Sequence, residues 1–155
     1  MSRANDQDAP RGTVETYFAP IHSAARMRDL AEVKRQLELG AQVDELNGRA
    51  KNGDGGNTPL WFACQGPWPG GLPLVSLLLE AGADVDRPCE HGTTALHLAT
   101  SWGHVDVVQR LLTAGATSSV KDADGRTALD RVEQGFRGSD ESKDELRALF
   151  ARLDQ

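Results

Sequence analysis

Three consecutive residues, Cys89, Glu90 and His91, carry side chains that can each bind a metal ion. A zinc site in a protein usually needs four ligands held at fixed spacing. The chain has only one further cysteine, Cys64, and it stands at the position of a small core residue in a predicted helix. We therefore expect no metal centre and no cofactor, and a metal-binding or enzymatic role for Cys89 and His91 is the less favoured alternative.

Motifs for nucleophilic catalysis or phosphate binding are absent from the sequence. It contains no G-x-S-x-G, no P-loop and no H-x-x-x-H pair. The stretches 53–56 and Asp124-Gly125 are typical of hairpin turns, because Asp-Gly readily supplies the positive φ that such turns need. Asp44 and Asp86 each end a Gly-Ala-x-Val-Asp string, where we expect their carboxylates to accept backbone N–H groups. The sequence thus predicts a protein that is not an enzyme.

A short segment recurs along the chain and indicates what positions these residues. Thr94–Ala99 reads Thr-Ala-Leu-His-Leu-Ala, and it corresponds to Thr58–Ala63 and, 33 positions further on, to Thr127–Val132. Pro20–Ala25 is a degenerate copy. Each of the first three copies is followed by a second apolar segment that ends in Gly-Ala. Helix pairs this short cannot bury their apolar faces alone, so stacked neighbours must supply the missing surface.

The second helix of each unit shows helical periodicity. In the third unit the apolar residues that share one face are Val105, Val108, Leu111 and Leu112. We expect Leu112 to be buried between two repeats. A glycine follows each of these helices, where a left-handed residue is favoured; the three are Gly40, Gly82 and Gly115.

A period near 33 residues with a T-P-L-H-x-A core resembles the ankyrin repeat. The resemblance covers about four units, from Ala19 to Leu153. It implies an all-α solenoid of helix-turn-helix units joined by hairpin-like finger loops. We expect a disordered tail over residues 1–13 and an ankyrin repeat domain over 14–155, with repeats at 14–45, 46–86, 87–119 and 120–155.

The outer repeats are predicted to act as caps. Glu32 and Gln36 stand where the third unit has Val107 and Leu111, which indicates an outer face without a covering repeat. Asp29 and Glu32 form a capping pair at the start of that helix. The last helix is predicted to start with a second capping box, Ser142-x-x-Glu145, and to bury Leu146, Leu149, Phe150 and Leu153.

Composition excludes several classes of partner. The net charge is −6, and only four lysines are present, so the clustered cations that nucleic-acid binding requires are not expected. There is no apolar run long enough to span a membrane and no signal peptide. Two cysteines and an arginine-rich, Ala- and Gly-rich composition favour a bacterial cytoplasm. A basic or neutral protein partner suits the acidic balance.

The resemblance also assigns structural roles to the histidines. His22 and His97 stand at the T-P-L-H position, where the imidazole bonds to loop backbone, and His104 stands at the corner between two helices. Trp61 replaces the histidine of its own repeat. This replacement puts the local hydrogen-bond network in question and predicts a large ring near the groove.

Two insertions depart from the regular repeat. Thr58 follows Gly40 by 18 positions, whereas the corresponding distance is 12 in the next two repeats, so the first finger loop is longer by six. The segment 66–71, Gly-Pro-Trp-Pro-Gly-Gly, replaces the helix-helix corner of the second repeat. Trp68 at its centre could fold back as a lid over the helix ends or serve as an exposed anchor for a partner.

In proteins of this family the partner usually lies in the concave face, against finger tips and the exposed ends of the first helices. Trp102 is the sharpest candidate, because other copies have a polar or small residue there and tryptophan is enriched at interface hot spots. Packing of Trp102 on the neighbouring repeat is the alternative. Glu133 and Gln134 stand at the end of the first helix of the fourth repeat. The predicted partner-binding residues are Arg26, Met27, Asp54, Asn57, Trp61, Gln65, Trp68, Glu90, His91, Thr93, Ser101, Trp102, Asp124 and Arg126.

These observations predict a non-enzymatic module that binds a protein partner of unknown identity through its concave groove and finger loops. We expect a monomer that binds neither nucleic acid nor membrane. An alternative within the same binding mode is a bacterial immunity or inhibitor protein that blocks a partner enzyme.

Overall fold

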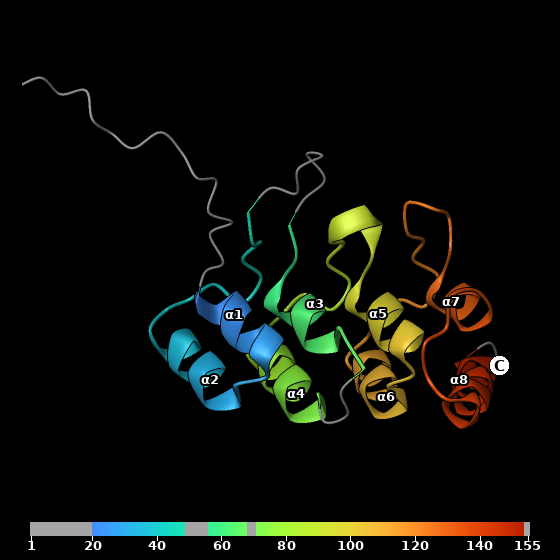
Figure 1. The fold of residues 1–155 in the computed structure, drawn as a ribbon. Helices are drawn as coiled ribbons and strands as arrows, with labels where there is room; N and C mark the ends of the chain where they lie inside the picture. The colour runs from blue at the N-terminus through green and yellow to red at the C-terminus, as the bar shows by residue number, and fades with distance from the viewer. Residues whose placement is uncertain (1–19, 49–55, 68–70, 154–155) are drawn as a thin grey trace, which may run out of the picture.

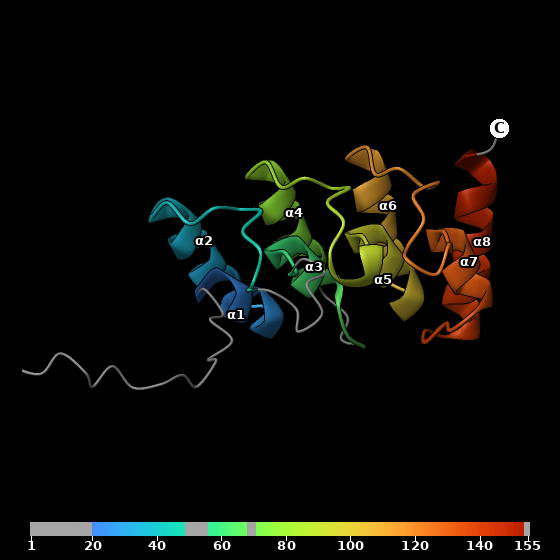
Figure 2. The same cartoon turned by 90° about the horizontal axis from the view of Figure 1, so that it is seen from above.

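Four helix pairs stack side by side along the chain. The computed structural model describes residues 20–48, 56–67 and 71–153, so the predicted tail over 1–13 lies outside the described residues. In Figure 1 the first helices of the pairs form one row and the second helices form another, and Figure 2 shows both rows from above. The helices are α1 Pro20–Met27, α2 Leu30–Glu38, α3 Pro59–Cys64, α4 Leu72–Glu80, α5 Ala95–Trp102, α6 Val105–Thr113, α7 Ala128–Glu133 and α8 Asp140–Leu153, with a 3-10 turn, η1, at Glu90–Gly92.

All regular elements in the described ranges are helical, which confirms the predicted all-α solenoid of helix-turn-helix units. None of the helices that the structure describes has the length and apolar character needed to cross a membrane. The glycines predicted to end the second helices adopt the expected left-handed backbone, with φ of 91° at Gly40, 90° at Gly82 and 95° at Gly115.

A recurring threonine sets the start of the first helices α3, α5 and α7. The Oγ1 of Thr58 accepts the backbone N–H of Trp61 at 3.2 Å, and the Oγ1 of Thr127 accepts that of Asp130 at 3.2 Å. At the start of α5, the N–H of Thr94 donates to Nδ1 of His97 at 3.2 Å. These bonds satisfy N–H groups that a helix leaves without partners in its first turn, which is why the helices begin at the repeated motif.

The second helices bury three aligned apolar positions between the repeats. These positions are at most 2% exposed, and they are occupied by Leu74, Val75 and Leu78 in α4 and by Val107, Val108 and Leu111 in α6. Leu112 is only partly buried against this core, so the expectation that it is buried between two repeats is wrong by one position. Periodicity alone does not determine which of two consecutive leucines points at the neighbouring helix.

The first repeat keeps one of these positions apolar and makes the other two polar. Val33 is fully buried, whereas Glu32 and Gln36 replace the flanking apolar residues. The Nε2 of Gln36 donates to Oε1 of Glu32 at 2.6 Å, so the two polar groups satisfy each other. The Oδ1 of Asp29 accepts the N–H of Glu32 at 3.0 Å, which confirms the predicted N-cap of α2.

The start of α8 differs from the prediction. The helix begins at Asp140, and the Oγ of Ser139 accepts the N–H of Ser142 at 3.2 Å. Ser139 therefore caps the helix, and the predicted capping box of Ser142 and Glu145 is wrong. Polar residues recur closely in this segment, so several of them match a capping pattern and the sequence does not single out the right one.

The apolar face of α8 is predicted correctly except at its end. Leu146 and Phe150 are buried and Leu149 is partly buried, but Leu153 is 48% exposed. Leu153 is the last residue of α8, and a side chain at the end of a helix has fewer neighbouring residues to cover it.

We predict that Leu111→Ala lowers the free energy of unfolding by about 2–5 kcal/mol, because it removes a fully buried side chain between two repeats. The matched control is Leu112→Ala, which should cost less because that side chain already contacts water. Urea denaturation of both variants measures the two values. Equal losses, or a larger loss for Leu112→Ala, would contradict the packing described here.

Candidate functional site

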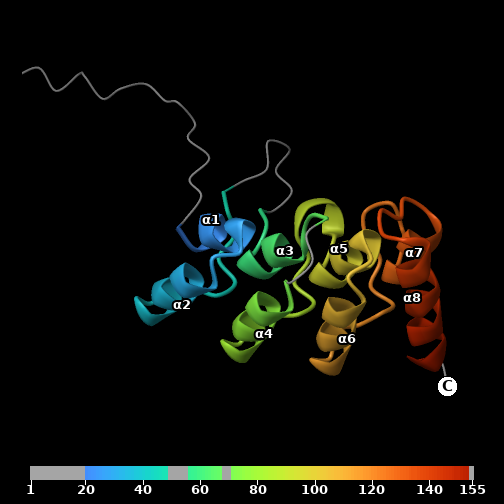
Figure 3. The same ribbon diagram turned by 60° about the horizontal axis from the view of Figure 1, so that its bottom comes forward.

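Three loops that connect successive helix pairs project from one side of the stack. These finger loops are finger 1, described over residues 41–48 and 56–58, finger 2, residues 84–94, and finger 3, residues 117–127. Figures 1 and 3 show fingers 2 and 3 extending beyond the row of first helices. The fingers and the C-terminal ends of the first helices together form one continuous face, which we call the finger face.

The fingers are tied to one another by hydrogen bonds. Between fingers 1 and 2, Oδ1 of Asn57 accepts the N–H of Glu90 at 3.0 Å, and Nδ2 of Asn57 donates to Oε2 of Glu90 at 3.4 Å. Between fingers 2 and 3, the N–H of Ala123 donates to the carbonyl oxygen of His91 at 2.9 Å. These bonds hold neighbouring fingers at fixed spacing, and finger 2 takes part in both.

A second set of bonds ties each first helix to the finger that follows it. The Nε2 of His22 donates to the carbonyl oxygen of Glu45 at 2.6 Å, and that of His97 donates to the carbonyl oxygen of Arg126 at 3.0 Å. The expectation that these histidines bond to loop backbone is therefore confirmed. Burial lowers the pKa of His97, which keeps its ring neutral and able to accept from Thr94 through Nδ1.

Trp61 takes the place of the histidine in the second repeat. Its Nε1 donates to Oγ1 of Thr93 at 2.9 Å, and Thr93 is the equivalent in finger 2 of Arg126 in finger 3. The bond between this first helix and the finger that follows is thus kept, with the indole N–H of Trp61 as donor in place of an imidazole N–H. The side chain is only 8% exposed, so the large ring expected near the groove is buried.

Asp44 and Asp86 accept backbone N–H groups, as predicted. These N–H groups belong to the next finger loop along the chain. Both carboxylate oxygens of Asp44 accept the N–H of Asp84, at 3.0 and 3.1 Å. Asp86 accepts the N–H of Thr117 at 2.9 Å and its hydroxyl at 2.6 Å. Each carboxylate therefore fixes the base of the next finger to that of its predecessor.

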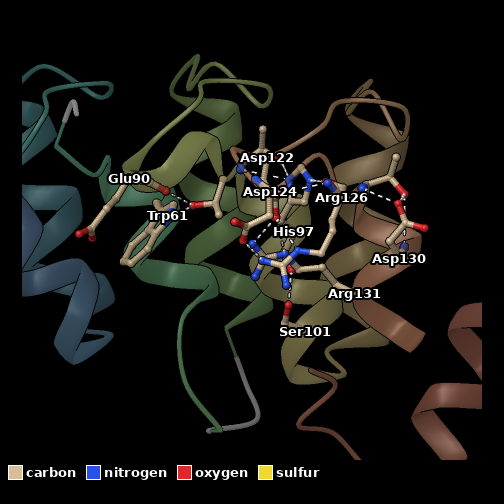
Figure 4. A network of polar contacts seen from close by, with 12 residues as sticks. Trp61, Glu90, His97, Ser101, Asp122, Asp124, Arg126, Asp130 and Arg131 are labelled. Carbon is tan, nitrogen blue, oxygen red and sulfur yellow. Dashed lines mark hydrogen bonds and ion pairs between the residues drawn. The ribbon is translucent and has the colours of Figure 1, made fainter. Parts of the chain in front are cut away.

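A buried carboxylate fixes the shape of finger 3. Oδ1 of Asp122 accepts the N–H of Asp124 at 2.9 Å and that of Arg126 at 3.0 Å, while Oδ2 accepts Nε of Arg131 at 3.1 Å. Figure 4 shows this carboxylate beside the guanidinium of Arg131, close to His97. Burial by itself raises the pKa of Asp122, but the N–H of Arg126 and the guanidinium of Arg131 outweigh it, so the pKa lies below its ordinary value.

The finger face is hollowed between α5 and α7. The hollow has a volume of about 350 Å³, and we call it the α5–α7 groove. Its lining includes Gln65, Trp102, Arg126, Arg131, Gln134 and Arg137. Trp102 is partly buried, and the guanidinium carbon of Arg137 lies 4.9 Å from the centroid of its ring. The ring therefore packs on a residue of the next repeat, which was one of the two alternatives for Trp102, and it also lines an open hollow.

The predicted partner-binding residues fall into three groups. Those with exposed or partly exposed side chains are Arg26, Met27, Gln65, Glu90, His91, Trp102, Asp124 and Arg126. Those with buried side chains are Asn57, Trp61, Thr93 and Ser101. Each member of the second group has a hydrogen-bond partner inside the protein, so its side chain supports the face from beneath. Asp54 and Trp68 lie outside the described residues.

Sequence reasoning missed two residues of the α5–α7 groove. Arg131 stands where the preceding repeats have Leu98 and Phe62, so a cation at an apolar position of the repeat was the available signal. Arg137 lies in the irregular loop between α7 and α8, where its N–H donates to the carbonyl oxygen of Ser101 at 2.8 Å. That loop is longer than the two-residue corners of the first and third repeats, so an alignment of the repeats does not place Arg137.

The Cys-Glu-His tripeptide does not present three ligands to one point. The thiol of Cys89 is buried and lies 3.7 Å from Oγ1 of Thr58, whereas His91 is exposed at the tip of finger 2 with a left-handed φ of 57°. Burial raises the pKa of Cys89, which disfavours the thiolate that binds metal. Within residues 20–48, 56–67 and 71–153, no group of three or more His, Cys, Asp or Glu side chains is arranged to hold a metal ion.

The family model and the similar proteins all point to one family. A family model described as ankyrin repeats, in three copies, matches residues 21–122. Over 124 residues the chain is 44% identical to ankyrin repeat and SAM domain-containing protein 6 of Rattus norvegicus, covering 79% of this chain and 13% of that protein. It is 37% identical over 110 residues to SH3 and multiple ankyrin repeat domains protein 2 of Homo sapiens, covering 70% and 6%.

A third relative is the probable E3 ubiquitin-protein ligase XBOS33 of Oryza sativa subsp. japonica, with 42% identity over 108 residues, 69% of this chain and 19% of that protein. The chain therefore spans less than a fifth of the length of each of these three relatives. The similarity lies in the repeats and does not carry over the activities of the whole proteins.

We predict that Asp122→Asn lowers the free energy of unfolding at neutral pH by about 1–3 kcal/mol, because it leaves Arg131 without its buried anionic partner. An aspartate has a pKa of about 3.9 in an unfolded chain, and that of Asp122 is lower when folded. Its contribution is therefore present above about pH 4 and is lost as pH falls through the folded pKa.

Thermal or urea unfolding as a function of pH tests this expectation. The difference between wild type and Asp122→Asn should shrink as the pH falls below about 4. Asp124→Asn is the matched control, since that side chain is 69% exposed, and it should melt like the wild type. A constant difference at all pH values would show that the carboxylate charge of Asp122 contributes nothing to stability.

Proposed function

Because this chain belongs to the ankyrin repeat family, we propose that it binds a protein partner by rigid docking on its finger face. Ankyrin repeats are generally modules for protein-protein interaction without catalytic activity. The relatives do not identify the partner, because this chain matches only the repeats, which are a small part of the length of each relative.

The observation that carries this proposal is the hydrogen-bond network beneath the finger face. Fingers 2 and 3 are joined by the N–H of Ala123 and the carbonyl of His91, and each first helix bonds to the finger that follows it. A surface that is already ordered loses little conformational entropy when a partner binds. The network therefore favours recognition by a preformed surface.

The α5–α7 groove is the part of this face best suited to be the centre of an interface. Its lining includes the large ring of Trp102 and three arginines, and hot spots in interfaces tend to be aromatic or arginine side chains in central pockets. The exposed side chains of Gln65 and Gln134 border it. Polar side chains around an aromatic centre match the usual arrangement of a polar rim around a more apolar core.

The test is selection of binders from a displayed library of random peptides, followed by affinity measurement on variants. Trp102→Ala should weaken the selected peptides about thirtyfold, since a central aromatic anchor contributes about 2 kcal/mol. Leu39→Ala is the matched control, because it truncates an exposed side chain at the end of α2, away from the groove. The control should bind like the wild type.

Circular dichroism melts show whether Trp102→Ala keeps its fold. Should that variant unfold, Gln65→Ala truncates an exposed side chain of the same groove and should also weaken binding. Selected peptides that bind all of these variants with wild-type affinity would place the binding site elsewhere and contradict the proposal.

A further inference from the structure

Positive charge gathers in the α5–α7 groove although the protein as a whole is acidic. The net charge of the chain is −6. The lining of the groove nevertheless contains three arginines, Arg126, Arg131 and Arg137, and no carboxylate side chain. A ligand in this hollow meets an environment of opposite sign to the average surface.

Two of the three guanidinium groups are held by carboxylates that lie outside the lining. Arg131 donates to Oδ2 of Asp122, and Arg126 donates to Asp124. The side chain of Asp122 is only 1% exposed, so it fixes Arg131 from beneath and does not itself face a ligand. These pairs orient two cations and offset part of their charge.

Arg137 is held differently. Its guanidinium lies over the ring of Trp102, and in the part of the chain that the structure describes no carboxylate forms an ion pair with it. A guanidinium over an aromatic ring is attracted through its charge, so this contact does not use up its five N–H donors. Those donors match the two oxygens of a carboxylate, which can accept from both arms of the fork.

We propose that the partner segment bound in the α5–α7 groove is acidic, and that Arg137 pairs with one of its Asp or Glu carboxylates. This inference rests on the proposed function and names the chemistry of the partner at the same face. It departs from the expectation of a basic or neutral partner, because net charge governs approach at long range whereas the groove lining governs contact.

The probe is a short fluorescein-labelled peptide of alternating Glu and Ser, measured by fluorescence anisotropy against matched peptides with Gln or Lys in place of Glu. Only the Glu peptide should bind, and its Kd should rise as salt is added. Arg137→Gln should raise that Kd about tenfold, the loss of one charge-assisted hydrogen-bond pair. Arg137→Lys keeps the charge but loses the planar fork, so its Kd should lie between that of the wild type and that of Arg137→Gln.

Arg35→Gln is the matched control, because it removes an exposed arginine from α2 and should leave the Kd unchanged. Arg137 is itself exposed, and melting curves of Arg137→Gln should overlay the wild type. A Glu peptide that fails to bind, an unchanged Kd in Arg137→Gln, or equal binding of the Gln peptide would each overturn the proposal. So would displacement of the Glu peptide by a single-stranded oligonucleotide of equal charge at the same concentration.

The two proposals fail in different ways. Library-selected peptides that depend on Trp102 but lack Asp and Glu would overturn the acidic partner and leave the finger face as the binding surface. Selected peptides that are insensitive to both Trp102→Ala and Gln65→Ala would overturn the finger face itself.

Discussion

A helix pair of this protein has too little apolar surface to form a core of its own. The first seven helices have only six to nine residues, and their buried positions lie against the next pair. The stack is therefore stabilised junction by junction, through Val33, Val75 and Val108 at equivalent places in successive second helices. Because the core is shared between neighbours, the loops that join the pairs are held at regular intervals, and this spacing creates the finger face.

Polar contacts at each junction convert that spacing into a fixed surface. The donor from the first helix changes from His22 to Trp61 to His97, yet each bonds to the finger that follows. What the fold requires at this position is an N–H at the right distance, and an imidazole or an indole can supply it. Variation of residue type is thus compatible with one geometry, and the exposed side chains above it can vary without altering that geometry.

Much of the fold could be predicted from the sequence because the same pattern of residues recurs in several repeats. The left-handed glycines and the threonine caps follow from local backbone chemistry, so they recur with the motif. Features that the repeat motif does not determine could not be predicted: the choice of Leu111 over Leu112, which α4 repeats with Leu78 over Leu79, and the position of Arg137 over Trp102. Both depend on which side chain a distant helix or loop meets, and helical periodicity does not contain that information.

The central claim is that recognition occurs on the finger face, at the α5–α7 groove. The most direct test is an NMR titration of ¹⁵N-labelled protein with a library-selected peptide. We expect the largest shift changes at the indole N–H of Trp102 and the backbone N–H groups of Arg126 and Arg137, with α4 and α6 unchanged. Changes confined to the second helices, with the Trp102 indole signal unmoved at saturation, would contradict it.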